Sequence, residues 1–343
     1  MNRHEISRAS VNGPDGVFVA LDLGTNNCRM LAAAPTRAGF RVIDSFSRIV
    51  RLGEGLQATG HLDDHAMDRT IEALHAVATR LTRRPIRALR AVATEACRRA
   101  VNGPAFLERV HAETGLRFTT ISPRVEALLA LESCAPLFSP SARRALLFDI
   151  GGGSTELAWV RLDTPNRRPD LIGYATLPAG VVTLAERHAA TSFDAVGFEA
   201  MVAEVRDPLA AFERTHRIAR EVQQGGVQLL GTSGTVTTLA GVALNLARYR
   251  RPLIDGTTLT AAASDAALTL LRGLGREGLR AHPCVGPERA DFVLPGCAVY
   301  QAIRDTWPMA EVTVADRGLR EGMLMQMMHA PTSSRPAPAP QLA

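Results

Sequence analysis

The feature that most constrains this chain is a hairpin pattern that occurs twice, once in each half. Residues 145–160 read ALLFDIGGGSTELAWV, which is an apolar run, an aspartate, a glycine turn and a second apolar run. Residues 17–32 read VFVALDLGTNNCRMLA and have the same layout. Two apolar runs joined by a glycine turn are typical of a β-hairpin. The repeat therefore predicts an internal duplication with one such hairpin in each half.

The turn of each hairpin is suited to binding an anion. Glycine has no Cβ, so its backbone N–H can approach a ligand closely, and successive N–H groups form a nest for phosphate oxygens. The alternative is a plain hairpin turn without a ligand. The candidate phosphate-binding residues of the two turns are Gly24, Thr25, Asn26, Gly151, Gly152, Gly153 and Ser154.

A third glycine turn, GTSGT at residues 231–235, follows an apolar run and opens a helix-like apolar run. The N-terminus of a helix after such a turn is a ready anion site. Gly231, Ser233 and Gly234 are therefore further candidates for phosphate binding.

Carboxylates accompany the two hairpin turns. Asp149 and Glu156 bracket the second turn, and Asp22 occupies in the first hairpin the place that Asp149 has in the second. Carboxylates beside a bound phosphate are useful mainly where a hard cation bridges them. We therefore expect Mg²⁺ or Mn²⁺ on Asp149 and Glu156, with Asp22 as a further ligand. The alternative for Asp22 is a cap of its own turn through the carboxylate.

The basic residues are all arginine, because the sequence contains no lysine, and the net charge is +5. This excludes a Walker-type phosphate lysine and a Schiff-base lysine. Arginine keeps its charge and binds phosphate oxygens in a fork, which suits an anionic substrate. The alternative is that the basic composition reflects an arginine-rich genome. Aromatic residues make up only 5% of the chain and are not interleaved with arginines, so nucleic acid binding by stacking is not expected.

The sequence predicts a cytoplasmic protein without a membrane partner. No apolar run reaches the ~18 residues that a membrane helix needs, and residues 1–16 lack the apolar segment of a secretory signal. Five scattered cysteines without a CxxC pair indicate reduced thiols. Residues 1–16 and the Pro- and Ala-rich residues 331–343 are predicted to be disordered.

The chain resembles the actin, sugar-kinase and Hsp70 superfamily, and within it the exopolyphosphatase and guanosine pentaphosphate phosphatase (Ppx/GppA) family. The resemblance implies an α/β fold of two duplicated ribonuclease H-like (actin-like ATPase) domains, over residues 17–135 and 136–330. Each would be a mixed sheet flanked by helices, with the active site in the cleft between them, and the last helix would pack back on the first domain. The matching segments, in the order of the family, are LDLGTNNCRML, ATEACRRAVN, ISPRVEALLAL, FDIGGGSTEL, LPAGVVTLAE, LGTSGTVTTLA, ERADFVLPGC and VADRGLREGML.

The resemblance also implies two catalytic residues. The family has an arginine that faces the phosphates, and Arg98 is at the matching position. The family usually has Ser-Gly-x-Glu-Glu-Ala around its catalytic carboxylate, which matches Glu126. The first glutamate of that motif is Val125 here and the glycine is Pro123, a departure that puts the substrate fit in question. The alternative for both candidates is a solvated helix face.

The implied reaction is metal-dependent hydrolysis of a phosphoanhydride, with water activated by Glu126. The implied substrates are inorganic polyphosphate and guanosine pentaphosphate. A short form without the C-terminal helical domain of long family members is expected, which favours shorter polyphosphates. The alternatives are an ATP-dependent kinase or ATPase of the same superfamily, and a protein that binds polyphosphate or an alarmone without cleaving it. The oligomeric state stays open, with a homodimer as one alternative.

Three local features complete the predictions. Arg289 and Asp291 are expected to form an ion pair that fixes a helix start. Residues 276–287 contain four glycines or prolines and are predicted to form a loop. The basic cluster at residues 248–252 suits either a polyanion or a solvated loop.

Overall fold

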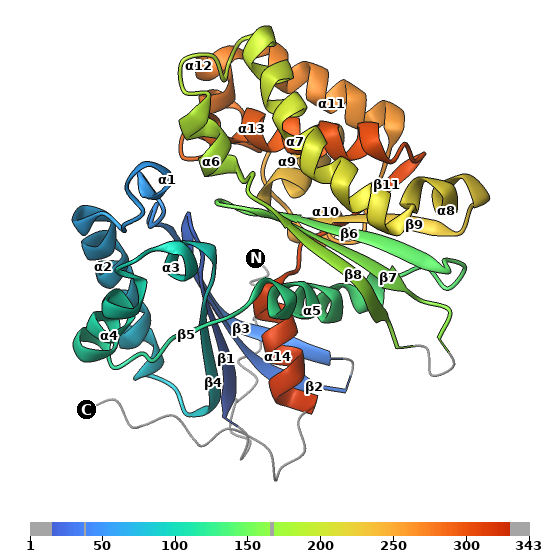
Figure 1. Cartoon of the computed structure of the whole chain (residues 1–343). Coiled ribbons are helices and arrows are strands. Elements are labelled where there is room, and N and C mark those ends of the chain that lie inside the picture. Colours follow the sequence, from blue (N-terminus) through green and yellow to red (C-terminus); the bar gives the residue numbers. More distant parts are fainter. Residues whose placement is uncertain (1–15, 38, 165–167, 330–343) are drawn as a thin grey trace, which may run out of the picture.

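The computed structural model describes residues 16–37, 39–164 and 168–329, and its chain forms two mixed sheets with helices packed around them (Figure 1). The segments predicted to be disordered lie outside the described residues, apart from Gly16.

The first sheet has five strands in the order β3-β2-β1-β4-β5. Strands β1, β2 and β3 run antiparallel, whereas β4 and β5 continue parallel to β1. The strands are β1 (Val17–Leu23), β2 (Asn27–Thr36), β3 (Gly39–Ile49), β4 (Ile86–Ala93) and β5 (Thr119–Thr120).

The second sheet has six strands in the order β10-β11-β9-β6-β7-β8. Strands β6, β7 and β8 run antiparallel, β9 and β11 continue parallel to β6, and β10 closes the edge antiparallel to β11. The strands are β6 (Arg144–Ile150), β7 (Thr155–Arg161), β8 (Asp170–Leu177), β9 (Val227–Thr232), β10 (Thr258–Thr260) and β11 (Glu311–Ala315).

The two sheets therefore repeat one arrangement. In each, three consecutive antiparallel strands are followed by parallel strands on the other side of the first, and β10 is the one addition in the second sheet. The predicted fold class, two duplicated mixed sheets flanked by helices, is confirmed.

Helices before residue 115 pack on the first sheet, whereas the helix of residues 123–134 packs on β7 and β8 of the second sheet and on the last helix. Asp63 caps the start of α2, because its carboxylate accepts a hydrogen bond from the Ala66 N–H (3.1 Å). The helical elements are α1 (Leu56–Thr59), α2 (Asp64–Leu81), α3 (Glu95–Arg99), α4 (Gly103–Thr114), α5 (Pro123–Cys134) and the 3₁₀ turn Ala135–Leu137.

Helices of the second half gather mostly on one face of the second sheet (Figure 1). Together with that sheet they enclose the largest apolar cluster, which includes Trp307, Tyr300 and Phe148. The helices are α6 (Val181–Arg187), α7 (Ala195–His216), α8 (Ile218–Gln224), α9 (Gly234–Ala243), α10 (Arg251–Ile254), α11 (Ala261–Gly273), α12 (Gly275–Ala281), α13 (Ala290–Thr306) and α14 (Leu319–His329).

The last helix, α14, crosses back to the first half of the chain. It follows β11 of the second sheet but packs against β1 and α5. Met323, Leu324 and Met327 of α14 are buried with Phe18 and Ala20 of β1. This crossing is one of the connections between the two halves.

Residues 276–287 are not a continuous loop as predicted, because α12 occupies residues 275–281. Leu279 of this helix is fully buried in the large apolar cluster. Burial of one leucine against α13 outweighs the unfavourable propensity of Gly278 within so short a helix.

None of the helices in the described ranges combines the length and the apolar character that crossing a bilayer requires.

Candidate active site

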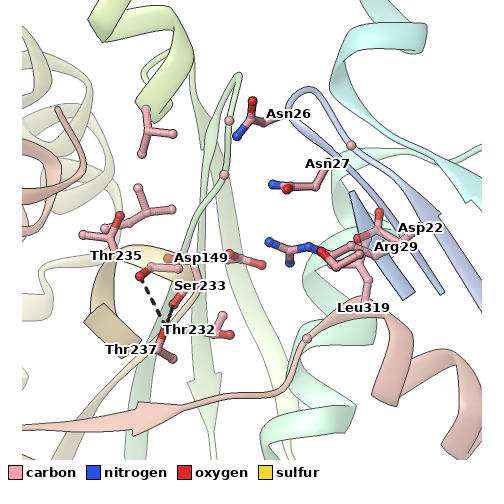
Figure 2. A pocket seen from close by; sticks show the side chains of 18 of the residues that line it. Asp22, Asn26, Asn27, Arg29, Asp149, Thr232, Ser233, Thr235, Thr237 and Leu319 are labelled. Carbon is pink, nitrogen blue, oxygen red and sulfur yellow. Dashed lines mark hydrogen bonds between the residues drawn. The ribbon is translucent and has the colours of Figure 1, made fainter. Parts of the chain in front are cut away.

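A cleft of about 400 Å³ lies between the two sheets, and both duplicated hairpin turns line it. Figure 2 shows Asn26 and Asn27 of the first turn on one wall and Asp149 of β6 on the other. Parallel strands β1 and β4 in one sheet and β6 and β9 in the other all end at this cleft, which is where α/β folds of this kind place their ligands.

The start of α6 holds the turn between β6 and β7 on the side away from the cleft. Its carbonyl oxygens at Gly151 and Gly152 accept hydrogen bonds from the N–H groups of Val181 (2.9 Å) and Val182 (2.8 Å) at the start of α6. The Gly151 N–H donates to Ser154 O within the hairpin (2.9 Å). Within the described residues, no hydrogen bond uses the N–H groups of Gly152, Gly153 or Ser154, so these three are available to an anion.

The turn between β1 and β2 is built in the same way. The carbonyls of Thr25 and Asn26 accept hydrogen bonds from the N–H groups of Gly53 (2.9 Å) and Val50 (2.9 Å), and the Gly24 N–H donates to Asn27 O (3.0 Å). The N–H groups of Gly24 and Gly151 each close their own hairpin, so they are not available to phosphate.

The two turns come into direct contact. A Cβ added to Gly152 would lie 3.2 Å from both Thr25 Cβ and Asn26 Cβ, and one added to Gly153 would lie 2.8 Å from Thr25 Oγ1. The buried Asn26 Oδ1 has no hydrogen-bond partner. A buried polar atom without a partner is costly, so its position in the cleft favours a ligand that completes it.

Glu126 is buried in the first turn of α5 and lines the cleft. Burial raises the pKa of the Glu126 carboxyl to about 7, although the hydrogen-bonded guanidinium of Arg98 acts in the opposite direction. A carboxylate with this pKa is poised to accept a proton near neutral pH.

Arg98 does not lie where the resemblance implies. Its guanidinium donates hydrogen bonds to Glu126, to Glu95 and to the carbonyl of Ile121 (2.8 Å), and it is not among the residues that line the cleft. Two carboxylates therefore hold it behind Glu126, whereas the prediction had it facing phosphate. The position is that of a residue that orients the proposed base.

The predicted metal ligands line the same cleft. Asp149 and Glu156 lie directly opposite each other in the register of β6 and β7. Burial raises the pKa of Asp149 to about 6, against the effect of Arg29, and burial with the charges of Glu126 and Asp149 raises the pKa of Glu156 well above its usual range. The pKa of Asp22 is also raised, by burial.

These acids fit a divalent cation that also binds the substrate. They share a desolvated cleft in which their charges repel, so a cation would favour their ionised forms. The described residues contain no group of three or more His, Cys, Asp or Glu side chains close enough to hold a metal by themselves. Mg²⁺ typically binds through one or two carboxylates, waters and substrate phosphates, which agrees with this donor set.

The third glycine turn contributes two of its three predicted residues. Ser233 has φ = +104°, and its buried hydroxyl oxygen lacks a hydrogen-bond partner in the cleft wall (Figure 2). Gly234, the first residue of α9, also lines the cleft. Gly231 does not: it lies within β9, where a Cβ would meet the Phe148 ring at 2.4 Å. Gly231 therefore makes room for the Phe148 ring, and its contact with phosphate stays a prediction.

The predicted ion pair between Arg289 and Asp291 is wrong. Asp291 binds Arg276 (2.8 Å), and Arg289 lines the cleft. In the basic cluster, Arg251 binds Glu321 of α14 (2.9 Å) and lines the cleft as well.

Sequence reasoning missed further arginines of the cleft, Arg29 and Arg320. Figure 2 shows the Arg29 guanidinium extending toward Asp149 on the opposite wall. Within the described residues, neither side chain has a hydrogen bond or an ion pair to the protein, so both are available to an anion. The length of the turn in the first hairpin places Arg29 opposite Asp22, and this pairing could have identified Arg29 from the sequence.

Known proteins resemble this chain over most of its length. Residues 32–330 match the sequence model of the Ppx/GppA phosphatase family. The chain is similar to the crystal structure of the Aquifex aeolicus member of the Ppx/GppA protein family (25% identity, TM-score 0.72), over 91% of this chain and 97% of that one. An exopolyphosphatase-like protein (25% identity, TM-score 0.79) and an exopolyphosphatase from Cytophaga hutchinsonii (21% identity, TM-score 0.81) match over the same shares of the chains.

Proposed function

The chain belongs to the Ppx/GppA phosphatase family, and within this family we propose that it is a metal-dependent hydrolase of phosphoanhydrides. The proposed reaction releases the terminal phosphate of inorganic polyphosphate, of guanosine pentaphosphate, or of both. The observation that carries the proposal is the position of Glu126, a buried carboxylate with a raised pKa, in the same cleft as two phosphate-suited turns.

In the proposed mechanism the turns bind the phosphates and Glu126 activates water. The N–H groups of Gly152, Gly153 and Ser154 would donate to oxygens of the transferred phosphoryl group, whose charge they stabilise. Glu126 would accept a proton from the attacking water. Arg98 would hold the Glu126 carboxylate in place through its hydrogen bond.

The acidic residues of the β6–β7 hairpin would hold the cation. Asp149 and Glu156 are the proposed ligands, with Asp22 on the opposite wall as a further one, and Mg²⁺ or Mn²⁺ is the proposed ion. When bound, the cation supplies positive charge to the phosphate oxygens during transfer. Ser154 donates a hydrogen bond to Glu156 (2.5 Å), which fixes that carboxylate beside the turn.

The position of Val125 weakens one argument for the alternative function, a protein that binds polyphosphate or an alarmone without cleaving it. Val125 replaces a glutamate of the family motif, but its side chain packs against the apolar cluster of β1 and α14 and does not line the cleft. Val125 therefore contributes no side chain to the lining of the cleft. The five cysteines are free and buried, which supports a cytoplasmic location.

Phosphate release tests the proposal. The substrates are a short polyphosphate, a long polyphosphate, guanosine pentaphosphate and ATP, each with Mg²⁺ and with EDTA. Release from polyphosphate or guanosine pentaphosphate that EDTA abolishes supports the proposal. Release from ATP alone would favour a kinase or ATPase, and tight polyphosphate binding without release would favour a sensor.

A further inference from the structure

The first turn of α6 lies directly behind the second phosphate-binding turn. Its backbone N–H groups at Val181 and Val182 bind the carbonyls of Gly151 and Gly152. The next carbonyl, Gly153 O, accepts a hydrogen bond from the side-chain hydroxyl of Thr183 (2.8 Å). Thr183 is buried and does not line the cleft.

These contacts determine which way the turn presents its donors. In a trans peptide the C=O and the following N–H point in opposite directions. Holding the Gly153 carbonyl from behind therefore directs the Ser154 N–H forward, and the same holds for the two preceding peptides. Gly152 and Ser154, which follow the held carbonyls, line the cleft.

Thr183 is the residue that holds a carbonyl of this turn through its side chain. The Gly151 and Gly152 carbonyls are held by backbone N–H groups, as are the Thr25 and Asn26 carbonyls of the first turn. Within the described residues, the Thr183 hydroxyl is the partner that holds the Gly153 carbonyl. Glycine flanks this peptide and lacks a Cβ to restrict it, so the peptide can rotate once the hydroxyl is removed.

We propose that Thr183 is a positioning residue that keeps the Ser154 N–H directed at the substrate phosphate. The inference rests on the proposed function, since it assigns a role within that phosphate site. Thr183 acts through the Gly153–Ser154 peptide and does not itself touch the substrate.

The test compares the wild-type chain with Thr183→Val, Thr183→Ser and Thr183→Ala. Valine keeps the shape and removes the donor, whereas serine keeps the hydroxyl. We expect Thr183→Val and Thr183→Ala to lower kcat/KM for phosphate release about tenfold, and Thr183→Ser to restore it to within about twofold. Calorimetric titration with inorganic phosphate gives a second readout, in which the Kd of the valine variant rises at least about threefold.

Thr70→Val is the matched control. Thr70 is a buried threonine of α2 whose hydroxyl donates to Ala66 O (2.7 Å), away from the cleft. We expect it to lower the melting temperature without changing kcat/KM or the phosphate Kd. Wild-type values for both Thr183→Val and Thr183→Ala, or a serine variant as weak as they are, would overturn the inference. Failure of the wild-type chain to hydrolyse any substrate would instead count against the proposed function, and the phosphate titration would still test Thr183.

Discussion

Asp149 lies directly opposite Glu156 in the β6–β7 hairpin, and at the equivalent place of the first hairpin Asp22 lies opposite Arg29. The duplicated fold thus carries two acids on one wall and an acid with an arginine on the other. In the proposed function, this difference would give the cleft a side suited to a cation and a side suited to an anion, as hydrolysis of a phosphoanhydride requires.

Asp149→Asn tests the cation-binding side. The change keeps the shape but removes a charge from the proposed ligand pair, so we expect the Mg²⁺ concentration for half-maximal phosphate release to rise at least about tenfold. The measurement is a Mg²⁺ titration at a fixed substrate concentration. Asp265→Asn, on the exposed face of α11, is the matched control and should leave the titration unchanged. An unaltered Mg²⁺ requirement in the Asp149→Asn variant would contradict the assignment of Asp149 as a cation ligand.

The pH dependence of kcat/KM should report the Glu126 carboxyl. Burial raises its pKa to about 7, and a general base is active only when ionised. Activity is therefore expected to fall as the pH is lowered through about 7 and to rise above it. A flat profile across neutral pH, at constant ionic strength and saturating Mg²⁺, would argue against Glu126 as the base.

Arg98→Gln should move that profile in a defined direction. The Arg98 guanidinium opposes the effect of burial on Glu126, so its removal raises the pKa of Glu126 further. The acid limb is expected to shift to higher pH, with part of the lost activity regained in alkaline buffer. Arg99→Gln, the adjacent and more exposed residue, should keep the wild-type profile. An Arg98 variant with an unshifted limb would show that the pair does not set the pKa of the base.

Gly180→Ala tests the close packing between α6 and the turn. A Cβ at Gly180 would lie 2.4 Å from Gly152 O and 2.5 Å from Ser154 N, so the backbone must move. We expect a loss of about 1–3 kcal/mol in the free energy of unfolding, with lower activity. Gly234→Ala, where a Cβ meets nothing within 4 Å, should stay within about 0.5 kcal/mol of the wild type. Equal stability of the two variants in urea unfolding would contradict this packing.

The apolar runs and glycine turns were sufficient to predict the duplicated hairpins, whereas the mixed sheets around them followed from the resemblance to the family. Asp22 and Asp149 are the last residues but one of buried strands, and a glycine turn that leaves few alternatives to a hairpin follows each strand. Glu126 followed from the family motif, and in the structure Ser122 caps its helix by accepting a hydrogen bond from the Val125 N–H.

The structural features that the sequence analysis did not give are contacts between segments that are distant in the sequence. Gly231 stands in a glycine turn by its sequence, but its lack of a Cβ makes room for Phe148 of the neighbouring strand. Arg98 is attracted by Glu126, which lies on another helix, and Arg320 reaches the cleft because α14 crosses back to the first sheet. Local patterns contain no information on such pairings.

The most direct measurement of the central claim is phosphate release by Glu126→Gln. Glutamine keeps the shape and can still accept the Arg98 hydrogen bond, but it cannot take a proton from water. With saturating polyphosphate and Mg²⁺ we expect kcat to fall about 10²–10⁴-fold, with an unchanged circular dichroism spectrum and melting temperature. A folded Glu126→Gln protein that retains wild-type turnover would contradict the assignment of Glu126 as the base.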